Sequence, residues 1–337
     1  MPKITAVGIA ARKAEDLLRE KQALARERVL RGPPSPFYRM LFTEDPHGKD
    51  GNPVQPFPVE KPYVQELLRA LDANRRLAVP KSRQVLATWT CLVWLLRRAM
   101  ARPSWYTAMM SMRKEESYGL IRRMRFLIEH MPTWMFDREP KHTKSIIELP
   151  NGSIIEAFPC IDRVGTSHTI GDFFGDEVRE WPDVDEVLRG SVIPALGAES
   201  HCVLISTAEE GPWDRFCNAN RVLTTYRSKS FVLSNDEWQE WDAENGFHVV
   251  RLHYSCDPAK NPSTPEGAEW YQEALVAYGG DPSNGKWQRE MEINFSAAGG
   301  TEIFSGLYAS RDEILVGPTD FPEHAFDFYA GFDFGPI

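Results

Sequence analysis

The sequence predicts an α/β fold with three layers, in which helices cover both faces of a mostly parallel β-sheet. Two observations lead to this prediction. Short apolar segments, such as residues 77–80, 170–175 and 202–206, alternate with longer amphipathic segments, as strands and helices do in a doubly covered sheet. With 337 residues, of which 42% are hydrophobic, the chain is also long enough to bury one large core.

The elements follow in order from the amino terminus. A charged helical pattern covers residues 11–31, and the stretch up to residue 60 is rich in Pro, Gly and Asp, which predicts an extended arm. Pro62 begins the next helix, because proline is favoured in a first helical turn. Strands are predicted at residues 77–80, 105–110, 146–149, 153–158, 170–175 and 202–206. Asn151-Gly152 is the predicted hairpin turn between the third and fourth of them.

The character of the chain changes after Asn235. Aromatic residues lie there among acidic segments with a helical pattern, which predicts a smaller helical subdomain; they are Trp238, Trp241, Trp270, Tyr271 and Trp287. A final strand is predicted at residues 328–334. The expected organisation is an N-terminal helix and arm (1–60), an α/β core (61–235), a lid or linker subdomain (236–322) and the first strand of a further domain (323–337).

Composition excludes several classes of protein. Five scattered cysteines without a CxxC pair favour free thiols in a reducing compartment over disulfides or a zinc site. No signal-peptide pattern opens the chain, and the longest apolar run, residues 86–96, is too short to cross a bilayer. The net charge is −9, yet residues 61–130 hold fourteen Lys and Arg against five Asp and Glu. This basic region fits a polyanion partner or, alternatively, a solvated helix face around Arg122, Arg123 and Arg125.

A candidate phosphate-binding loop follows the strand at residues 77–80. Aligning Thr88 with the last hydroxyl of the pattern G-x-x-x-x-G-K-[ST] puts Leu86 at the second glycine and Ala87 at the usual lysine. Lys81 then stands at the first glycine, from where it can supply the missing charge, and Arg83 adds a second cation. An ordinary strand–loop–helix connection is the alternative interpretation of these residues.

Two further motifs end predicted strands. Asp176 and Glu177 follow residues 170–175, where one carboxylate can bind magnesium and the other can contact the attacking water. Ser206 and Thr207 follow another apolar segment, where hydroxyls can bond the γ-phosphate or simply cap the next turn.

Two single residues extend the pattern. Gln65 lies twelve residues before the strand at 77–80, where an amide can read the adenine edge. Arg163 lies in a polar loop before the acidic strand, and it is either a finger that reaches a neighbouring subunit's nucleotide or a plain loop arginine.

Taken together, a glutamine, K-S-R-Q-x-x-x-T, an acid pair and I-S-T stand in a fixed order. As a set over roughly residues 60–337, this order resembles the large terminase subunit of tailed bacteriophages, the motor that drives DNA into the procapsid. Residues 286–295 look like that family's stretch leaving the ATPase region, and residues 329–335 look like the first strand of its RNase H-like nuclease. The resemblance implies a P-loop (ASCE-type) ATPase core with a lid subdomain. That family tolerates deviant loops, including a lysine at the position of Lys81.

The resemblance also implies roles for individual residues. It places Glu177, Arg163 and Arg83 in catalysis, Gln65, Lys81, Ser82, Arg83, Gln84 and Thr88 in ATP binding, Asp176 and Thr88 on Mg²⁺, Ser206 and Thr207 in coupling, and Asp333 in an incomplete nuclease metal site. Asp333 alone cannot hold two metal ions, so we expect the chain to be the ATPase region of a longer protein. The implied partners are double-stranded DNA, the portal protein and the small terminase subunit. The implied state is a monomer in isolation and a homo-oligomeric ring at the procapsid, in the host cytoplasm and without a membrane.

Two alternatives stay open. A superfamily 2-type helicase or translocase shares the order of motifs but needs a second RecA-like domain. A DNA-binding scaffold with a decayed nucleotide site would account for Leu86 and Ala87, whereas the intact Asp176, Glu177 and Thr88 favour a working site.

Overall fold

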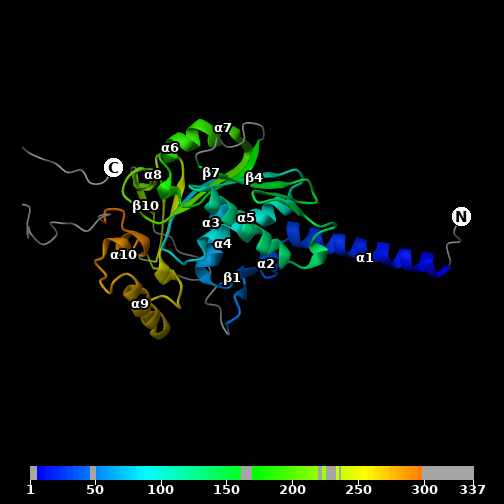
Figure 1. Cartoon of the computed structure of the whole chain (residues 1–337), viewed down its shortest axis with the longest axis horizontal. Helices are drawn as coiled ribbons and strands as arrows, with labels where there is room; N and C mark the ends of the chain where they lie inside the picture. Colours follow the sequence, from blue (N-terminus) through cyan, green and yellow to red (C-terminus); the bar gives the residue numbers. More distant parts are fainter. Residues whose placement is uncertain are drawn as a thin grey trace, which may run out of the picture. The chain divides into compact units, whose positions relative to one another are not determined.

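A mixed β-sheet lies at the centre of the computed structural model, which describes residues 6–45, 51–160, 169–218, 222–224, 233–234 and 237–297 (Figure 1). The strands are β1 (Phe42–Glu44), β2 (Val54–Pro56), β3 (Arg76–Pro80), β4 (Tyr106–Ser111), β5 (Lys141–His142), β6 (Ile146–Glu148), β7 (Ile154–Pro159), β8 (Ile170–Gly175), β9 (Leu196–Ser206), β10 (Val222–Thr224), β11 (Trp238–Asp242) and β12 (His248–Leu252). The α-helices are α1 (Ala6–Arg31), α2 (Ser35–Tyr38), α3 (Pro62–Ala73), α4 (Ala87–Ala101), α5 (Lys114–Glu129), α6 (Val184–Val187), α7 (Ile193–Ala195), α8 (Pro212–Asn218), α9 (Pro265–Ala277) and α10 (Gly285–Glu290). Shorter turns of helix are η2 (Thr133–Met135), η3 (Val178–Glu180), η4 (Leu188–Val192) and η5 (Tyr254–Cys256).

The order of strands in the main sheet is β10-β11-β12-β3-β9-β8-β4-β7-β6-β5. The strands from β12 to β7 run parallel, and antiparallel strands flank them on both sides. In an ASCE-type core an additional strand separates the loop strand from the acidic strand. In this sheet β9 lies between β3 and β8, which agrees with the predicted fold class.

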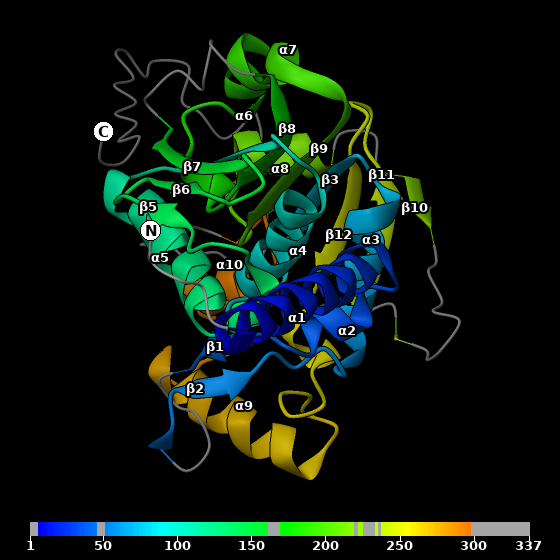
Figure 2. The same ribbon diagram turned by 90° about the vertical axis from the view of Figure 1, so that its right-hand side faces the viewer.

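Helices cover both faces of the sheet, as the predicted three layers require (Figure 2). Leu77 and Val79 of β3 face a core shared with α3, α4 and α5. Ala78, which points to the opposite face, belongs to a second core with η3, α6, η4 and α8. Side chains of successive strand residues point to opposite faces, so a strand that is apolar on both sides is buried between two layers.

A buried ion pair fixes the start of β8. Two guanidinium nitrogens of Arg98 lie 2.8 Å from the two carboxylate oxygens of Asp172, and the Trp105 indole N–H donates to the same carboxylate at 2.6 Å. Both members of the pair are almost fully buried. Asp172 is therefore a packing residue of the core, away from the carboxyl end of its strand.

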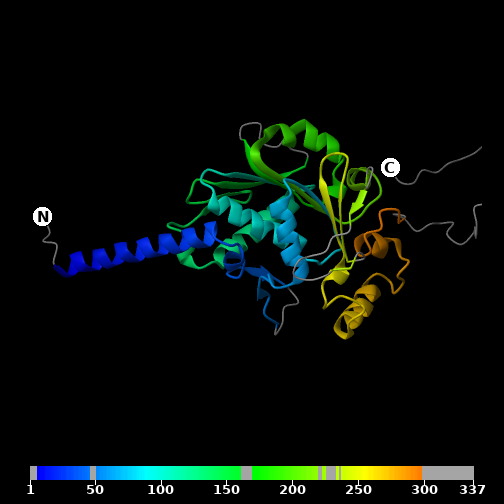
Figure 3. The same cartoon turned by 180° about the vertical axis from the view of Figure 1, so that it is seen from behind.

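The boundary predicted at residue 235 is wrong. β12 pairs in parallel with β3, so residues 238–252 complete the core sheet and do not belong to a separate subdomain. Trp238 and Trp241 lie in β11, where a helix was predicted. The prediction failed because the charged residue Glu240, which lies between them, is also buried, so the sequence does not show the alternation of apolar and polar residues that is typical of a strand. The helical part begins only after β12, with η5, α9 and α10 (Figure 3). Residues of the predicted arm and lid belong with the core to one compact unit, Met1–Ala297.

Other predicted elements agree closely with the structure. β8 has the predicted bounds, β9 begins earlier than expected at Leu196, and the Asn151-Gly152 turn has Gly152 at a φ of 83°. Arg163, Asp333 and the strand predicted at 328–334 lie outside the described residues. Among the helices that are described, none is both long and apolar enough to cross a membrane.

Candidate functional site

Three predicted motifs meet at one edge of the sheet because β3, β9 and β8 are neighbours and run parallel. Pro80 pairs with Ser206 in register, and Gly175 pairs with Leu204. The carboxyl ends of the three strands therefore lie together, which is where ligands bind in open α/β sheets. Gly175 allows β8 to reach this edge, since a Cβ there would lie 2.6 Å from the Trp181 ring.

The first half of the loop between β3 and α4 is fixed by its backbone. Its first three N–H groups each donate to a carbonyl of a different element at 2.8–2.9 Å: Lys81 to Ser206, Ser82 to Leu252 and Arg83 to Glu290. The second half leads into α4, whose first N–H groups have no partner within the helix. The end of the loop, together with the positive end of the 15-residue helix, is the part suited to bind an anion.

The loop contains no glycine but adopts backbone angles that glycine favours. Gln84 has a φ of 58° and Leu86 a φ of 54°, both in the left-handed region. Each costs about 1–2 kcal/mol for a residue with a side chain. Leu86 thus reproduces the turn expected of the second glycine, and its partly buried side chain packs against the core.

A hydrogen bond joins the loop motif to the acidic motif. The Thr88 hydroxyl donates to the carboxylate of Asp176 at 3.3 Å, from the first turn of α4 to the end of β8. Asp176 is 6% exposed and also accepts the N–H of Glu177 at 3.0 Å. Its own N–H donates to Met110 of β4, so the position of the carboxylate is fixed from both sides.

Burial and the charges nearby explain the raised pKa of Asp176. Burial is the main reason that its pKa is raised to about 6, and the negative charge of Glu177 raises it further. Lys81 and Arg123 lie close enough to pull the pKa down in part. Arg123 comes from α5, so two cations from separate elements face this carboxylate. A buried carboxylate with a raised pKa is typical of functional sites and of sites that receive a cation.

Glu177 lies at the turn that follows β8. Its φ of 49° places it in the left-handed region, where non-glycine residues are uncommon. Its side chain is half-buried, whereas that of Asp176 is buried. Strained backbone of this kind persists only where the surrounding structure holds it, and it is enriched at functional sites.

The residues at the end of β9 are buried and connect the neighbouring segments. The Ser206 hydroxyl accepts the N–H of Arg179, which follows the acid pair, and the Ser206 carbonyl accepts the N–H of Lys81. The Thr207 hydroxyl is fully buried and has no hydrogen-bond partner among the described residues. Because buried hydroxyls are almost always paired, Thr207 is available to a group that binds at this edge.

An acidic residue from α10 joins the loop to the segment after the acid pair. Glu290 is buried, and its carboxylate lies 3.3 Å from Nε of Arg83 and 3.7 Å from Nη2 of Arg179. The Tyr278 hydroxyl donates to the same carboxylate at 2.8 Å. Arg179 also lies 3.5 Å from Glu209, which follows β9.

Two predicted ATP-binding residues have other surroundings. The Ser82 hydroxyl accepts the N–H of Tyr254 and donates to the carbonyl of Met291, so this buried side chain is taken up by structural contacts. Gln65 lies on the exposed face of α3, in the wall of a cavity of about 630 Å³ shared with residues 33–39. No residue of the loop or of the acid pair lines that cavity.

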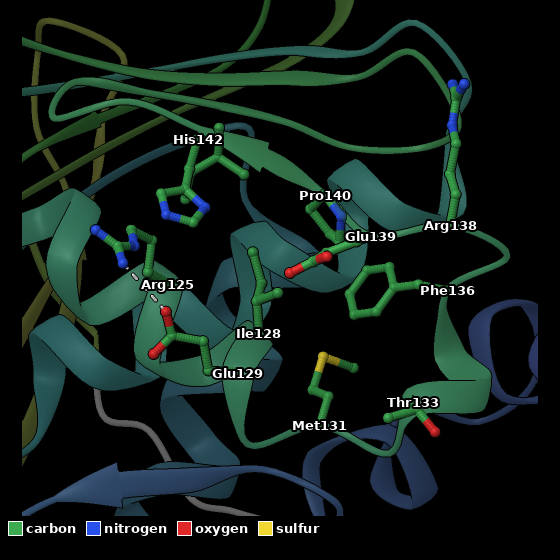
Figure 4. Close-up of a pocket in the computed structure, with 11 residues that line it drawn as sticks. Arg125, Ile128, Glu129, Met131, Thr133, Phe136, Arg138, Glu139, Pro140 and His142 are labelled. Atoms are coloured by element: carbon green, nitrogen blue, oxygen red, sulfur yellow. Dashed lines mark hydrogen bonds and ion pairs between the residues drawn. The ribbon is translucent and has the colours of Figure 1, made fainter.

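A second cavity, of about 400 Å³, lies at the end of α5 beside η2 and β5 (Figure 4). Ile128, Met131 and Phe136 form an apolar wall, and the ion pair of Arg125 with Glu129 lies at one side. None of the predicted site residues lines this cavity.

Sequence reasoning missed four residues of the site: Arg123, Arg179, Lys260 and Glu290. Arg179 had a local signal, since it follows Asp176-Glu177 by two positions at the end of a predicted strand. Lys260, which donates to the carbonyl of Gln84, and Glu290 come from segments far along the chain. Nothing in their immediate sequence points to the loop.

Comparison with known proteins found likenesses only among solved structures. No family model and no curated protein matches the chain. The large terminase ATPase domain of Thermus phage P74-26 is 15% identical with a TM-score of 0.47, over 68% of this chain and 92% of that one. The large terminase of bacteriophage HK97 is 15% identical with a TM-score of 0.49, over 80% of this chain and 55% of that one. A large terminase from a thermophilic bacteriophage in complex with ADP is 14% identical with a TM-score of 0.40, over 68% of this chain and 52% of that one.

Proposed function

We propose that this chain is an ATP-hydrolysing motor subunit that packages viral double-stranded DNA into a procapsid, as a large terminase subunit does. The observation that carries the proposal is the hydrogen bond from the Thr88 hydroxyl to the Asp176 carboxylate. It joins two motifs that lie far apart in the sequence, at the edge where Ser206 ends a third strand. A loop hydroxyl, an acid pair and a cation at one strand edge are the parts that phosphoryl transfer requires.

Thr88 and Asp176 fit a magnesium ion. Mg²⁺ prefers oxygen ligands and usually keeps waters and substrate phosphates in its shell, so one carboxylate and one hydroxyl suffice. Within the described ranges, no cluster of three or more His, Cys, Asp or Glu side chains could hold a metal ion by itself. A bound Mg²⁺ would neutralise charge on the β- and γ-phosphates.

The residues of the chain itself supply the remaining functions. Lys81 and the N–H groups at the start of α4 bind the phosphates. Glu177, beside the metal-binding position and half-exposed, orients the attacking water and accepts its proton. Thr207 contacts the γ-phosphate. When the γ-phosphate is released, Ser206 transmits the change to the phosphate-binding loop and to the segment after the acid pair, through its hydrogen bonds with the N–H groups of Lys81 and Arg179.

The other parts of the proposal rest on the resemblance of the motifs. They are Gln65 as the adenine-reading residue, Arg163 as a finger acting in a neighbouring subunit, and Arg83 as a catalytic cation. They also include double-stranded DNA, the portal protein and the small terminase subunit as partners, in a homo-oligomeric ring within the host cytoplasm. The basic excess in residues 61–130 supports a polyanionic partner. A nuclease centre at Asp333 belongs to the same proposal.

One observation favours a second candidate function. The hydroxyl of Ser82 is taken up by contacts within the protein, as expected of a DNA-binding scaffold whose nucleotide site has decayed. This candidate predicts that the chain binds DNA but not Mg-ATP.

Titration of the purified chain with a fluorescent ATP analogue in Mg²⁺ separates the two candidates. We expect saturable, Mg²⁺-dependent binding that Thr88→Val weakens about tenfold, since one hydrogen bond to a charged group is lost. Thr133→Val, at an exposed threonine of η2, is the matched control and should bind like the wild type. Absence of binding by the wild type at millimolar nucleotide would favour the decayed site. Binding without ATP turnover in the presence of procapsids and DNA would contradict a motor.

A further inference from the structure

The conformation of the phosphate-binding loop, residues 81–88, needs support from outside the loop. Gln84 and Leu86 both have positive φ angles, and neither is glycine. Such residues stay in the left-handed region only where neighbouring groups hold them there. Leu86 is held by packing of its side chain against the core. Gln84 is exposed, so packing cannot hold it.

Two residues from the helical part of the chain reach this loop. The Lys260 ammonium donates to the carbonyl of Gln84 itself. Glu290 contacts the adjacent residue twice, because its carbonyl accepts the Arg83 N–H at 2.8 Å and its carboxylate lies 3.3 Å from Arg83 Nε. Lys260 therefore contacts the strained residue at its own carbonyl, and Glu290 fixes the residue that precedes it.

Both residues are themselves held in place. Nζ of Lys260 lies 5.1 Å from the centroid of the Trp270 ring, and the negative charge of Asp257 acts to raise the pKa of this ammonium, which burial lowers to about 8. The Glu290 side chain is 5% exposed and accepts the Tyr278 hydroxyl at 2.8 Å. Side chains fixed in this way, one half-buried and one buried, can position a partner without moving themselves.

We propose that Lys260 and Glu290 are positioning residues that hold the phosphate-binding loop in the conformation that glycines provide in the usual motif. The inference deepens the proposed function and rests on it only for its effect on nucleotide binding. In this arrangement the helical part of the chain is required for a working loop. A substitution at either residue acts through Gln84 and Arg83.

Hydrogen–deuterium exchange of the full chain without nucleotide tests the positioning directly. Lys260→Met and Glu290→Gln each remove a charged group without removing the side-chain stem. Both should speed exchange of the hydrogen-bonded amides of Ser82, Arg83 and Thr90 about tenfold, the loss expected for one hydrogen bond to a charged group. Glu292→Gln is the matched control, since this nearby acid bonds His253, Tyr254 and Trp287 and does not contact the loop. It should leave loop exchange within twofold of the wild type.

Rescue by glycine separates positioning from a general loss of stability. In a Gln84→Gly background, Lys260→Met should no longer change loop exchange, because glycine adopts a positive φ at no steric cost. Exchange of the β4 amides reports on the fold in every variant, and a variant that exposes β4 is replaced by the other positioning variant. Unchanged loop exchange in both Lys260→Met and Glu290→Gln would overturn the inference. An effect of Glu292→Gln equal to theirs, or failure of Gln84→Gly to rescue, would also overturn it.

Nucleotide titration of the same variants distinguishes this inference from the proposed function. Lys260→Met should raise the dissociation constant of the fluorescent ATP analogue by about the same factor as it speeds amide exchange in the loop, about tenfold. In the Gln84→Gly background, Lys260→Met should leave the dissociation constant unchanged. If the wild type binds no nucleotide, the proposed function fails, whereas the exchange data still decide whether Lys260 and Glu290 position the loop.

Discussion

Replacement of Asp176 by asparagine is expected to stabilise the metal-free protein above pH 6. The pKa of this carboxyl is raised from its ordinary 3.8 to about 6, first by burial and then by the charge of Glu177. A shift of about two units corresponds to about 3 kcal/mol, at 1.36 kcal/mol per unit. The amide of asparagine carries no charge and can still accept the Glu177 N–H.

The sign of the effect depends on pH. Well below pH 3.8 the carboxyl is protonated in both the folded and the unfolded chain, so it does not change the free energy of unfolding. Between about pH 4 and pH 6 the unfolded chain releases the proton while the folded chain keeps it, and stability falls as pH rises. Above about pH 6 the full cost of the buried charge is present, and Asp176→Asn removes it.

Urea unfolding in EDTA, at pH 4 and at pH 7.5, measures the difference. Asp176→Asn should exceed the wild type by about 3 kcal/mol at pH 7.5 and by less than about 1 kcal/mol at pH 4. Asp16→Asn, at an exposed position of α1, is the control and should behave like the wild type at both values. A variant less stable than the wild type at pH 7.5, or an advantage that does not vary with pH, would refute the reasoning.

Three further outcomes are expected. Lys81→Ala should weaken Mg-ATP binding by about 1.5–3 kcal/mol, the value of a charge-assisted contact to phosphate, and an unchanged dissociation constant would exclude Lys81 from the phosphate site. Glu177→Gln should keep Mg-ATP binding while hydrolysis in the assembled motor falls by roughly 10²–10⁴; the same profile in Asp176→Asn, with Glu177→Gln fully active, would reverse the two roles. Asp172→Ala leaves the buried Arg98 without its partner and should cost about 3–5 kcal/mol in urea unfolding. A loss below about 1 kcal/mol would show that the pair does not hold β8.

The strand ends of the site could be predicted because each has a local signal. Residues 77–80 and 170–175 are short apolar runs that stop at polar residues, and their parallel pairing follows from the helices between them. β11, in contrast, has no local sequence signal of a strand. Its buried Glu240 is bonded by the indole of Trp238 and by Arg69, so a charged residue stands at a core position and the pattern of a strand is lost.

The support of the loop could not be predicted for a different reason. Lys260 and Glu290 act on residues about two hundred positions earlier, and a single sequence contains no sign of such pairings. Leu86 stands at the position of the second glycine, yet it has the positive φ that a glycine would adopt there, and the packing of its side chain against the core holds the turn. The motifs at the ends of β3, β8 and β9 could therefore be located from the sequence, whereas Lys260 and Glu290, which contact the loop from distant segments, could not.

The position of β3 in the sheet has a consequence for how the protein forms. Its two neighbours, β9 and β12, are both synthesised more than a hundred residues after it. Loop closures of that length are slow and must precede the contacts that reward them. During synthesis, β3 has neither partner until residue 206 has left the ribosome, and its second neighbour is complete only at residue 252. The phosphate-binding loop bonds both of these strands, through the N–H groups of Lys81 and Ser82, and we therefore expect it to take its final conformation only after residue 252 has been synthesised.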